Sequence, residues 1–288
     1  MSKRTLGVIG GSGLYAVPGA EVRATHAVET AFGAPSDEII EAELGDTKLL
    51  FLPRHGRDHR FAPHEVNYRA NILALKMLGA EQILSFSAVG SLKEELPPGT
   101  FVTVDQYIDR TRTRAGTFFQ GFGVVAHVGL AHPVDEALRL ALFDAARRAG
   151  ASVVDRGAYV CIEGPQFSTL AESLTHQRDG ASVIGMTNMP EARLAREAEL
   201  PYAALAMVTD YDCWHPSEAT VDVATVVATM KKNGALALET LRALAPALPD
   251  PASSPASRAL DGAIMTRFES ISHEAKRALA PLIEKYVR

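Results

Sequence analysis

Short apolar runs that end in glycine or polar residues alternate along this chain with longer segments of helical spacing. Leu6–Ile9, Gln82–Val89 and Tyr202–Val208 have the continuous apolar character of strands that are buried on both faces. Glu65–Leu78 places apolar residues three and four positions apart and stops at Gly79, which is typical of a helix. Strands that alternate with helices predict an α/β fold with helices on both faces of a sheet.

Two early strand-like runs indicate that the sheet is mixed. Glu38–Leu44 and Lys48–Leu52 are separated only by the turn signal Gly45-Asp46, which favours an antiparallel pair. Further strands are expected at Phe101–Ile108, Ala158–Ile162 and Ser182–Ile184, and further helices at Val134–Ala149, Leu170–Arg178, Pro190–Glu199 and Asp222–Leu244. We therefore predict a three-layer α/β/α arrangement around a twisted mixed central sheet.

Domain organisation is expected to be simple. Residues 1–248 should form one domain, since one large α/β unit fits this length. Pro246–Pro255 is rich in proline and predicts a linker, and Ser257–Tyr286 is expected to be mostly helical. Residues 249–288 are thus predicted to be a linker and C-terminal helical extension that packs on the same domain.

Charge and cysteine content narrow the function classes. The 288 residues carry a formal net charge of −5, which disfavours nucleic-acid coats and binders of anionic membranes, so any anion must be held by a local site. No run approaches the ~18 apolar residues of a transmembrane helix, and the apolar core of a signal peptide is missing. The two cysteines, Cys161 and Cys213, cannot form a disulfide framework, so we expect a cytoplasmic protein.

In open α/β sheets, ligands bind beyond the carboxyl ends of strands, so the segments after the strands are candidate sites. Gly10-Gly11-Ser12-Gly13 follows the first strand; its glycines permit close approach of an anion, and Ser12 adds a hydroxyl donor. The alternatives are a tight turn or a dinucleotide-binding loop, although the spacing does not match GxGxxG.

Other strand ends also carry hydrogen-bond donors. Arg54-His55-Gly56-Arg57 follows one strand, where arginine can hold a tetrahedral oxyanion through paired N–H donors and a protonated histidine adds another. Ser87 and Ala88 end a further strand, and Thr187 follows another. Each segment alone could be a solvated loop. Together they supply several donors and no carboxylate, which is the composition that phosphate needs: Ser12, Arg54, His55, Ser87, Ala88 and Thr187.

Histidines near this loop could also be metal ligands. His55, His59 and His64 match no helical HxxxH spacing, and arginines and Asp58 intervene. No metal is expected.

Asp210-Tyr211-Asp212 follows the most apolar strand. Residues two apart in an extended segment point to the same side, so repulsion and burial should keep one of the two carboxyls protonated near neutral pH. A protonated aspartate donates one hydrogen bond and accepts another, which matches the N7 and 6-amino edge of adenine. The alternatives are two solvated loop acids or a helix cap. Phe167, after another strand, could stack on a base or pack in the core.

These segments together resemble the trimeric purine nucleoside phosphorylase family. The similarity runs from about residue 5 to 245 and is carried by Gly10–Gly13, Pro53–Gly56, Asn67–Asn71, Ala88–Ser91, Glu163–Pro165 and Met186-Thr187. Thr209–Trp214 resembles the branch that acts on 5′-methylthioadenosine, because relatives specific for 6-oxopurines carry an asparagine-type motif there.

The resemblance implies reversible phosphorolysis of methylthioadenosine to adenine and 5-methylthioribose 1-phosphate, a reaction of purine and methionine salvage. It implies a homotrimer or a dimer of trimers that binds nucleoside and phosphate and needs no metal or organic cofactor. Asp210 would be the acid at purine N7, and the six donors named above would hold phosphate. Further nucleoside contacts would come from Phe167, Ser168, Met186, Tyr211, Asp212, Val223 and Val226, and from His127 of a neighbouring subunit.

Three alternatives remain open at this point. The closest is a purine nucleoside phosphorylase that acts on inosine, guanosine or methylthioinosine. A nucleosidase would use water and need no phosphate. A non-catalytic nucleotide-binding module would bind a dinucleotide without turnover.

Overall fold

The computed structural model describes residues 3–11, 17–216 and 223–286, and its centre is a large mixed sheet. The strands are β1 (Arg4–Gly10), β2 (Glu21–His26), β3 (Ile39–Leu44), β4 (Thr47–Pro53), β5 (Gln82–Ser91), β6 (Phe101–Thr103), β7 (Gln106–Asp109), β8 (Val153–Asp155), β9 (Ala158–Cys161), β10 (Val183–Gly185) and β11 (Tyr202–Asp210). Their order is β2-β3-β4-β1-β5-β10-β9-β7, and β11 joins β5 to β6, which pairs with β8. Because β2, β3 and β4 are antiparallel whereas β4, β1, β5 and β11 are parallel, the predicted mixed sheet is confirmed.

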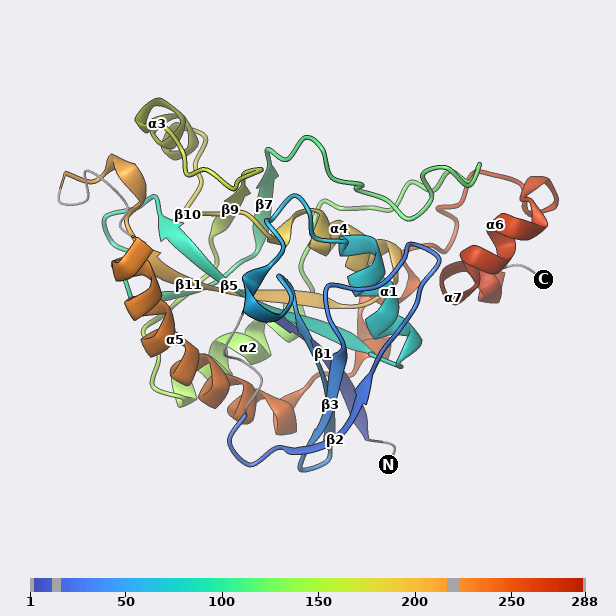
Figure 1. The fold of residues 1–288 in the computed structure, drawn as a ribbon, viewed down its shortest axis with the longest axis horizontal. Helices are drawn as coiled ribbons and strands as arrows, with labels where there is room; N and C mark the ends of the chain where they lie inside the picture. The colour runs from blue at the N-terminus through green and yellow to red at the C-terminus, as the bar shows by residue number, and fades with distance from the viewer. Residues whose placement is uncertain (1–2, 12–16, 217–222, 287–288) are drawn as a thin grey trace.

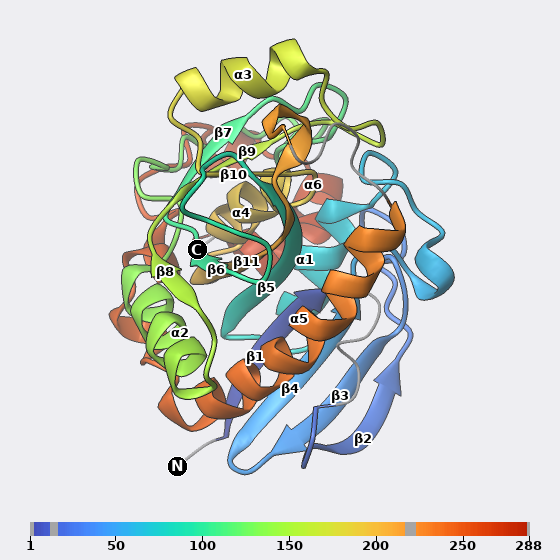
Figure 2. The same cartoon turned by 90° about the vertical axis from the view of Figure 1, so that its left-hand side faces the viewer.

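Helices cover both faces of this sheet (Figures 1 and 2). They are α1 (Tyr68–Met77), α2 (Glu136–Arg148), α3 (Leu170–Arg178), α4 (Asn188–Glu197), α5 (Val223–Leu244), α6 (His273–Ala278) and α7 (Ala280–Ile283). Figure 2 shows α2 and α5 side by side on one face, and α3 beyond the end formed by β7, β9 and β10. Within the described ranges, none of the helices combines the length and apolarity that crossing a bilayer would require.

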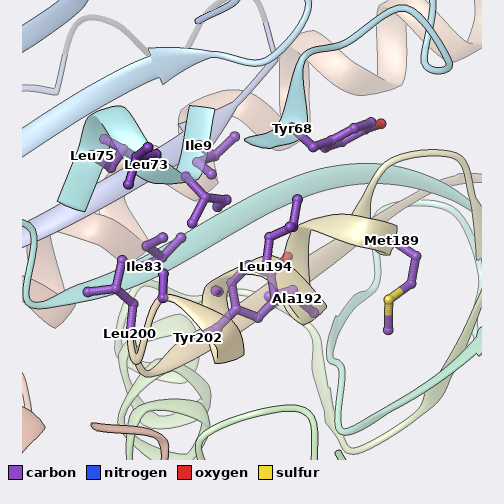
Figure 3. Packing of buried hydrophobic residues seen from close by; sticks show 14 of the residues in the cluster. Ile9, Tyr68, Leu73, Leu75, Ile83, Met189, Ala192, Leu194, Leu200 and Tyr202 are labelled. Atoms are coloured by element: carbon purple, nitrogen blue, oxygen red, sulfur yellow. The ribbon is translucent and has the colours of Figure 1, made fainter. Parts of the chain in front are cut away.

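Alternation along β5 and β11 explains the two helical layers. Ile83 packs in one core cluster with residues of α1 and α4, whereas its neighbour Leu84 packs in a second cluster with residues of α2 and α5. Ala204 and Leu205 of β11 divide between the clusters in the same way, because successive side chains of a strand point to opposite faces. Figure 3 shows the first cluster.

Two sequence predictions of secondary structure are wrong. Phe101–Ile108 is not one strand, since β6 and β7 are separate and pair with different neighbours. Ser257–Tyr286 is not mostly helical, because α6 and α7 are short and the rest consists of turns and single 3₁₀ turns. Pro281, which lacks a backbone N–H, stands at the start of α7 and interrupts the run. The exposed edge strand β2 was not predicted, since its sequence lacks an apolar run.

The C-terminal segment contributes to the first core cluster. Leu260, Ile271, Leu279 and Ile283 are buried there with residues of α1 and α4. The division into a domain of residues 1–248 and an extension of residues 249–288 stays a prediction.

The two edges of β5 are used differently. β11 runs parallel along one edge, from Ile83 to Gly90. On the other edge, β1 runs parallel beside β5 as far as Ser85, whereas β10 runs antiparallel beside Gly90 and Ser91. β1 and β10 therefore point toward each other, and both end beside the middle of β5.

We predict that Leu279→Ala lowers the free energy of unfolding by about 2–5 kcal/mol, because it empties a buried leucine site between the C-terminal segment and the main core. Urea denaturation would measure the change. Met265→Ala is the control, since Met265 is 67% exposed and should shift stability by less than about 0.5 kcal/mol. Equal effects of the two substitutions would contradict the shared core.

Candidate active site

The convergence of β1 and β10 brings two hydroxyl groups together beside β5. Ser87 lies on β5, and Thr187 lies between β10 and α4; both are largely buried. Their Oγ and Oγ1 atoms are 3.0 Å apart. Thr187 makes no side-chain hydrogen bond as the cap of α4, so its hydroxyl is directed to Ser87 instead. Two of the predicted phosphate donors are thus neighbours, although they lie far apart in the sequence.

Arg54 follows β4 directly and is only 2% exposed. Its Nε and Nη2 donate to the two carboxylate oxygens of Glu191 at 2.8 and 3.2 Å. Nη2 also donates to Ser85 Oγ, and Nη1 donates to Phe86 O. The paired N–H fork that was expected to hold an oxyanion therefore faces Glu191, whereas Nη1 donates to the backbone of β5.

His55 is also buried, and its Nδ1 lies 2.9 Å from Phe61 O. Because a carbonyl can only accept, Nδ1 carries the proton and donates. Burial, and then the charge of Arg54, lower the pKa of His55 to about 4. The ring is therefore neutral at pH 7, and the expected protonated imidazolium is wrong. Its ring stacks on that of His59, with centroids 4.3 Å apart.

Asp210 ends β11 opposite Gly90 of β5 and is 8% exposed. Its Oδ2 accepts from Thr209 Oγ1 at 2.7 Å, and its Oδ1 accepts from the Asp212 N–H at 2.9 Å. A Cβ at position 90 would lie 3.0 Å from Asp210 Oδ1, so the glycine gives the carboxylate its space. Asp210 is thus held rigidly at the strand end.

The predicted arrangement of Asp210 and Asp212 on one side of an extended segment is wrong. The strand ends at Asp210, and Asp212 has a positive φ of 54° at the start of a 3₁₀ turn. This turn directs the Asp212 side chain to α3, where Ser173 Oγ donates to its Oδ2 at 2.6 Å. Burial raises the pKa of Asp212. The carboxyl group with the raised pKa therefore lies in the 3₁₀ turn that follows β11, two residues after the strand ends.

The loop after β9 meets the segment after β11. Cys213 Sγ donates to Ser168 O at 3.3 Å. Phe167 is 51% exposed, so it does not pack in the core. Ser168 Oγ is buried without a hydrogen-bond partner among the described residues, which is unusual for a polar atom unless a ligand completes it.

Arg114 joins the loops after β9 and β10. Its side chain is 1% exposed. Nη1 donates to the carbonyls of Met186 and Met189 at 2.7 and 2.6 Å, Nη2 donates to Glu163 O at 2.7 Å, and Nε donates to Glu163 Oε1 at 3.0 Å. Met186 in turn leaves no room for a Cβ at Gly164, which would lie 2.5 Å from its Sδ. The Arg114 guanidinium therefore fixes the backbone of both loops: the loop after β9, which carries Phe167, and the loop after β10, which carries Met186.

The remaining predicted residues lie apart from these contacts or outside the description. Ala88 and Tyr211 are partly exposed beside Ser87 and Asp210 in the chain. His127 is exposed, and its N–H donates to Ala263 O in the C-terminal segment. Ser12 lies outside the described residues, and the side chains of Val223 and Val226 at the start of α5 are outside them too.

Sequence reasoning missed Glu191, Arg114 and Tyr159. Nothing in the sequence marks Glu191 or Arg114, since periodicity does not distinguish a buried ion pair from a solvated one. Tyr159 is part of an apolar strand and has the pattern of a core residue. The one available signal is Gly185, an isolated glycine at a strand end, which often marks a close approach of another part of the chain.

Among the described residues, no three His, Cys, Asp or Glu side chains gather where they could hold a metal ion.

Comparisons with known proteins identify the family of this chain. The family model described as "Phosphorylase superfamily" matches residues 5–246. S-methyl-5′-thioadenosine phosphorylase of Geobacter sulfurreducens is 50% identical over 286 residues, which cover 99% of this chain and 100% of that protein. The crystal structure of a methylthioadenosine phosphorylase from an antarctic soil metagenomic library has a TM-score of 0.91 at 44% identity, and the match covers 98% of this chain and 99% of that one.

A variant of adenosine/methylthioadenosine phosphorylase from Schistosoma mansoni, solved in complex with methylthioadenosine, has a TM-score of 0.80 at 38% identity; the match covers 85% of this chain and 91% of that one. The chain belongs to the phosphorylase superfamily, and within it to the S-methyl-5′-thioadenosine phosphorylases. The family resemblance and the α/β fold inferred from the sequence are thereby confirmed.

We predict that Arg54→Ala lowers the free energy of unfolding by about 3–5 kcal/mol, because it leaves the Glu191 carboxylate buried without its partner. Urea denaturation would measure the loss. Arg57→Ala is the matched control three positions along the loop, where the side chain is 61% exposed and its ion pairs should contribute less than about 1 kcal/mol. A loss no larger than that of the control would show that Glu191 does not depend on Arg54.

Proposed function

We propose that the protein catalyses the reversible phosphorolysis of S-methyl-5′-thioadenosine to adenine and 5-methylthioribose 1-phosphate. It is a pentosyltransferase of the nucleoside phosphorylase type, as its full-length relatives are. The observation that carries the proposal is the spacing of two groups along one strand. Ser87, which we assign to phosphate, lies on β5, and Asp210, which we assign to the base, pairs with Gly90 three residues further on.

That spacing suits a nucleoside. Three residues of strand span roughly 10 Å, which leaves room for a sugar between an anion at Ser87 and a base at Asp210. Phosphate would accept from the hydroxyls of Ser87 and Thr187, from Arg54 Nη1 and from the Ala88 backbone, with Ser12 completing the site. Neutral His55 keeps Nε2 as an acceptor, which suits the hydroxyl of hydrogen phosphate.

The base would lie between Phe167 and the segment after β11. Asp210 would protonate or hydrogen-bond N7 as the glycosidic bond breaks, because negative charge then develops on the purine. Asp212 and the unpartnered Ser168 Oγ would contact the edge of the base, and Tyr211 would border it. Met186 would lie against the ribose, where phosphate stabilises the positive charge of C1′ and then attacks.

Val223 and Val226 would line the 5′-methylthio pocket, and His127 would close it from a neighbouring subunit. This role of His127 requires an oligomer, and a homotrimer or a dimer of trimers stays a prediction. Neither a metal nor an organic cofactor enters the proposed chemistry, since phosphate is the co-substrate. The cytoplasmic location likewise stays a prediction from cysteine usage.

Product analysis tests the reaction directly. With methylthioadenosine and phosphate we expect adenine and 5-methylthioribose 1-phosphate, and without phosphate we expect no turnover. Methylthioinosine should react roughly 10⁴-fold less efficiently, because its 6-oxo edge mismatches a site built to hydrogen-bond an amine. Free methylthioribose formed without phosphate would indicate a nucleosidase, and equal turnover of methylthioinosine would indicate a 6-oxopurine enzyme.

We predict that Asp210→Asn lowers kcat/KM for methylthioadenosine by at least ~10², the contribution of a positioned general acid. The amide has the shape of the carboxyl group, so the melting temperature should change little. Initial rates at saturating phosphate would measure the loss, with the exposed Asp46→Asn as a control that should retain full activity. Full activity of the Asp210 variant would remove this residue from the chemistry.

A further inference from the structure

Gly185, at the end of β10, has no space for a side chain. A Cβ at this position would lie 2.0 Å from the Tyr159 hydroxyl oxygen and 2.5 Å from its Cζ. β9 and β10 are parallel, and Tyr159 pairs with Val183, which faces the same side of the strand as Gly185. The Tyr159 ring therefore lies across Gly185, and the missing side chain lets its hydroxyl pass β10.

The Tyr159 hydroxyl contacts both Ser87 and Thr187, the two residues whose hydroxyls we propose bind phosphate. Tyr159 Oη lies 3.3 Å from Ser87 Oγ, and it accepts from the Thr187 backbone N–H at 3.4 Å. Tyr159 is fully buried. Burial raises the pKa of its hydroxyl to about 12, so the group keeps its proton at neutral pH. Since the Thr187 N–H donates to the oxygen, the proton of Tyr159 is available for Ser87.

Counting donors shows why this proton matters. Ser87 and Thr187 carry one hydroxyl proton each, and at 3.0 Å one hydroxyl donates to the other. When both protons turn to an anion, Ser87 Oγ loses Thr187 as a possible donor. Loss of a hydrogen bond to the buried Ser87 Oγ costs free energy, unless a third residue donates to this oxygen.

We propose that Tyr159 is a positioning residue for phosphate: its hydroxyl donates to Ser87 Oγ and so frees the Ser87 and Thr187 protons for the anion. Gly185 is the residue that permits this reach. The inference rests on the proposed phosphate site and deepens it by naming the group that orients its hydroxyls.

Tyr159→Phe removes only the hydroxyl and is the direct test. Isothermal titration with inorganic phosphate, together with the KM values for phosphate and methylthioadenosine, would measure its effect. We expect phosphate to bind about fivefold more weakly, the effect of one lost hydrogen bond, and the KM for methylthioadenosine to stay unchanged. In a Ser87→Ala background, Tyr159→Phe should have no further effect on phosphate.

Tyr107→Phe is the matched control. Tyr107 is the neighbouring tyrosine, with ring centroids 5.7 Å apart, but its hydroxyl donates to Asn188 Oδ1. Phosphate affinity should be unchanged in this variant. Equal weakening in both phenylalanine variants, no weakening in Tyr159→Phe, or an undiminished effect in the Ser87→Ala background would each overturn the inference. Wild-type protein that binds no phosphate would instead contradict the proposed function itself.

Discussion

The opposed strands on one edge of β5 are the constraint from which the site follows. β1 and β10 approach each other along that edge, and both end beside its middle. The chain segments that leave them must therefore turn out of the sheet at the same place. This places Thr187 beside Ser87, and it places Arg54, whose backbone N–H donates to Gly10 O at the end of β1, beside Phe86. In a sheet of parallel strands alone, the segments that carry Thr187 and Arg54 would lie in a row along the edge formed by the carboxyl ends of the strands.

Charge inside the site is balanced before any ligand arrives. The Arg54 guanidinium is buried against Glu191, and Tyr202 also donates to this carboxylate at 2.8 Å. Such a pair is weak evidence for stability, because desolvation offsets much of the attraction. Its effect here is geometric, since it fixes the end of β4 against the first turn of α4. The anion would then meet the neutral hydroxyls of Ser87 and Thr187 and the N–H groups of Arg54 Nη1 and the Ala88 backbone.

The sequence predicts best those features that depend on residues close together in the chain, and worst those that depend on contacts between distant residues. Apolar runs and glycine stops predict β5 and β11 closely, because these strands are buried and their patterns are local. The boundaries of α3 are also predicted, although only Ser173 and His176 of this helix are buried. The C-terminal segment has similar composition but is divided by Pro281, and its short helices depend on packing rather than periodicity. The candidate site shows the same division. Thr187 follows a strand as predicted, whereas Ser87, which was predicted at a strand end, lies inside β5, because this strand continues to Ser91. The turn of Asp212 toward Ser173 depends on a backbone conformation that no pattern shows.

Arg114 has a consequence for how this enzyme can change. One guanidinium is bonded to the carbonyls of two separate loops and to the Glu163 carboxylate. An insertion or deletion in either loop would move its carbonyl acceptor away from the Arg114 guanidinium, the donor that both loops share. Variation in sugar and base recognition is therefore expected to arise by exchanging side chains on a fixed backbone, and the lengths of these loops should be among the slowest features of the molecule to evolve.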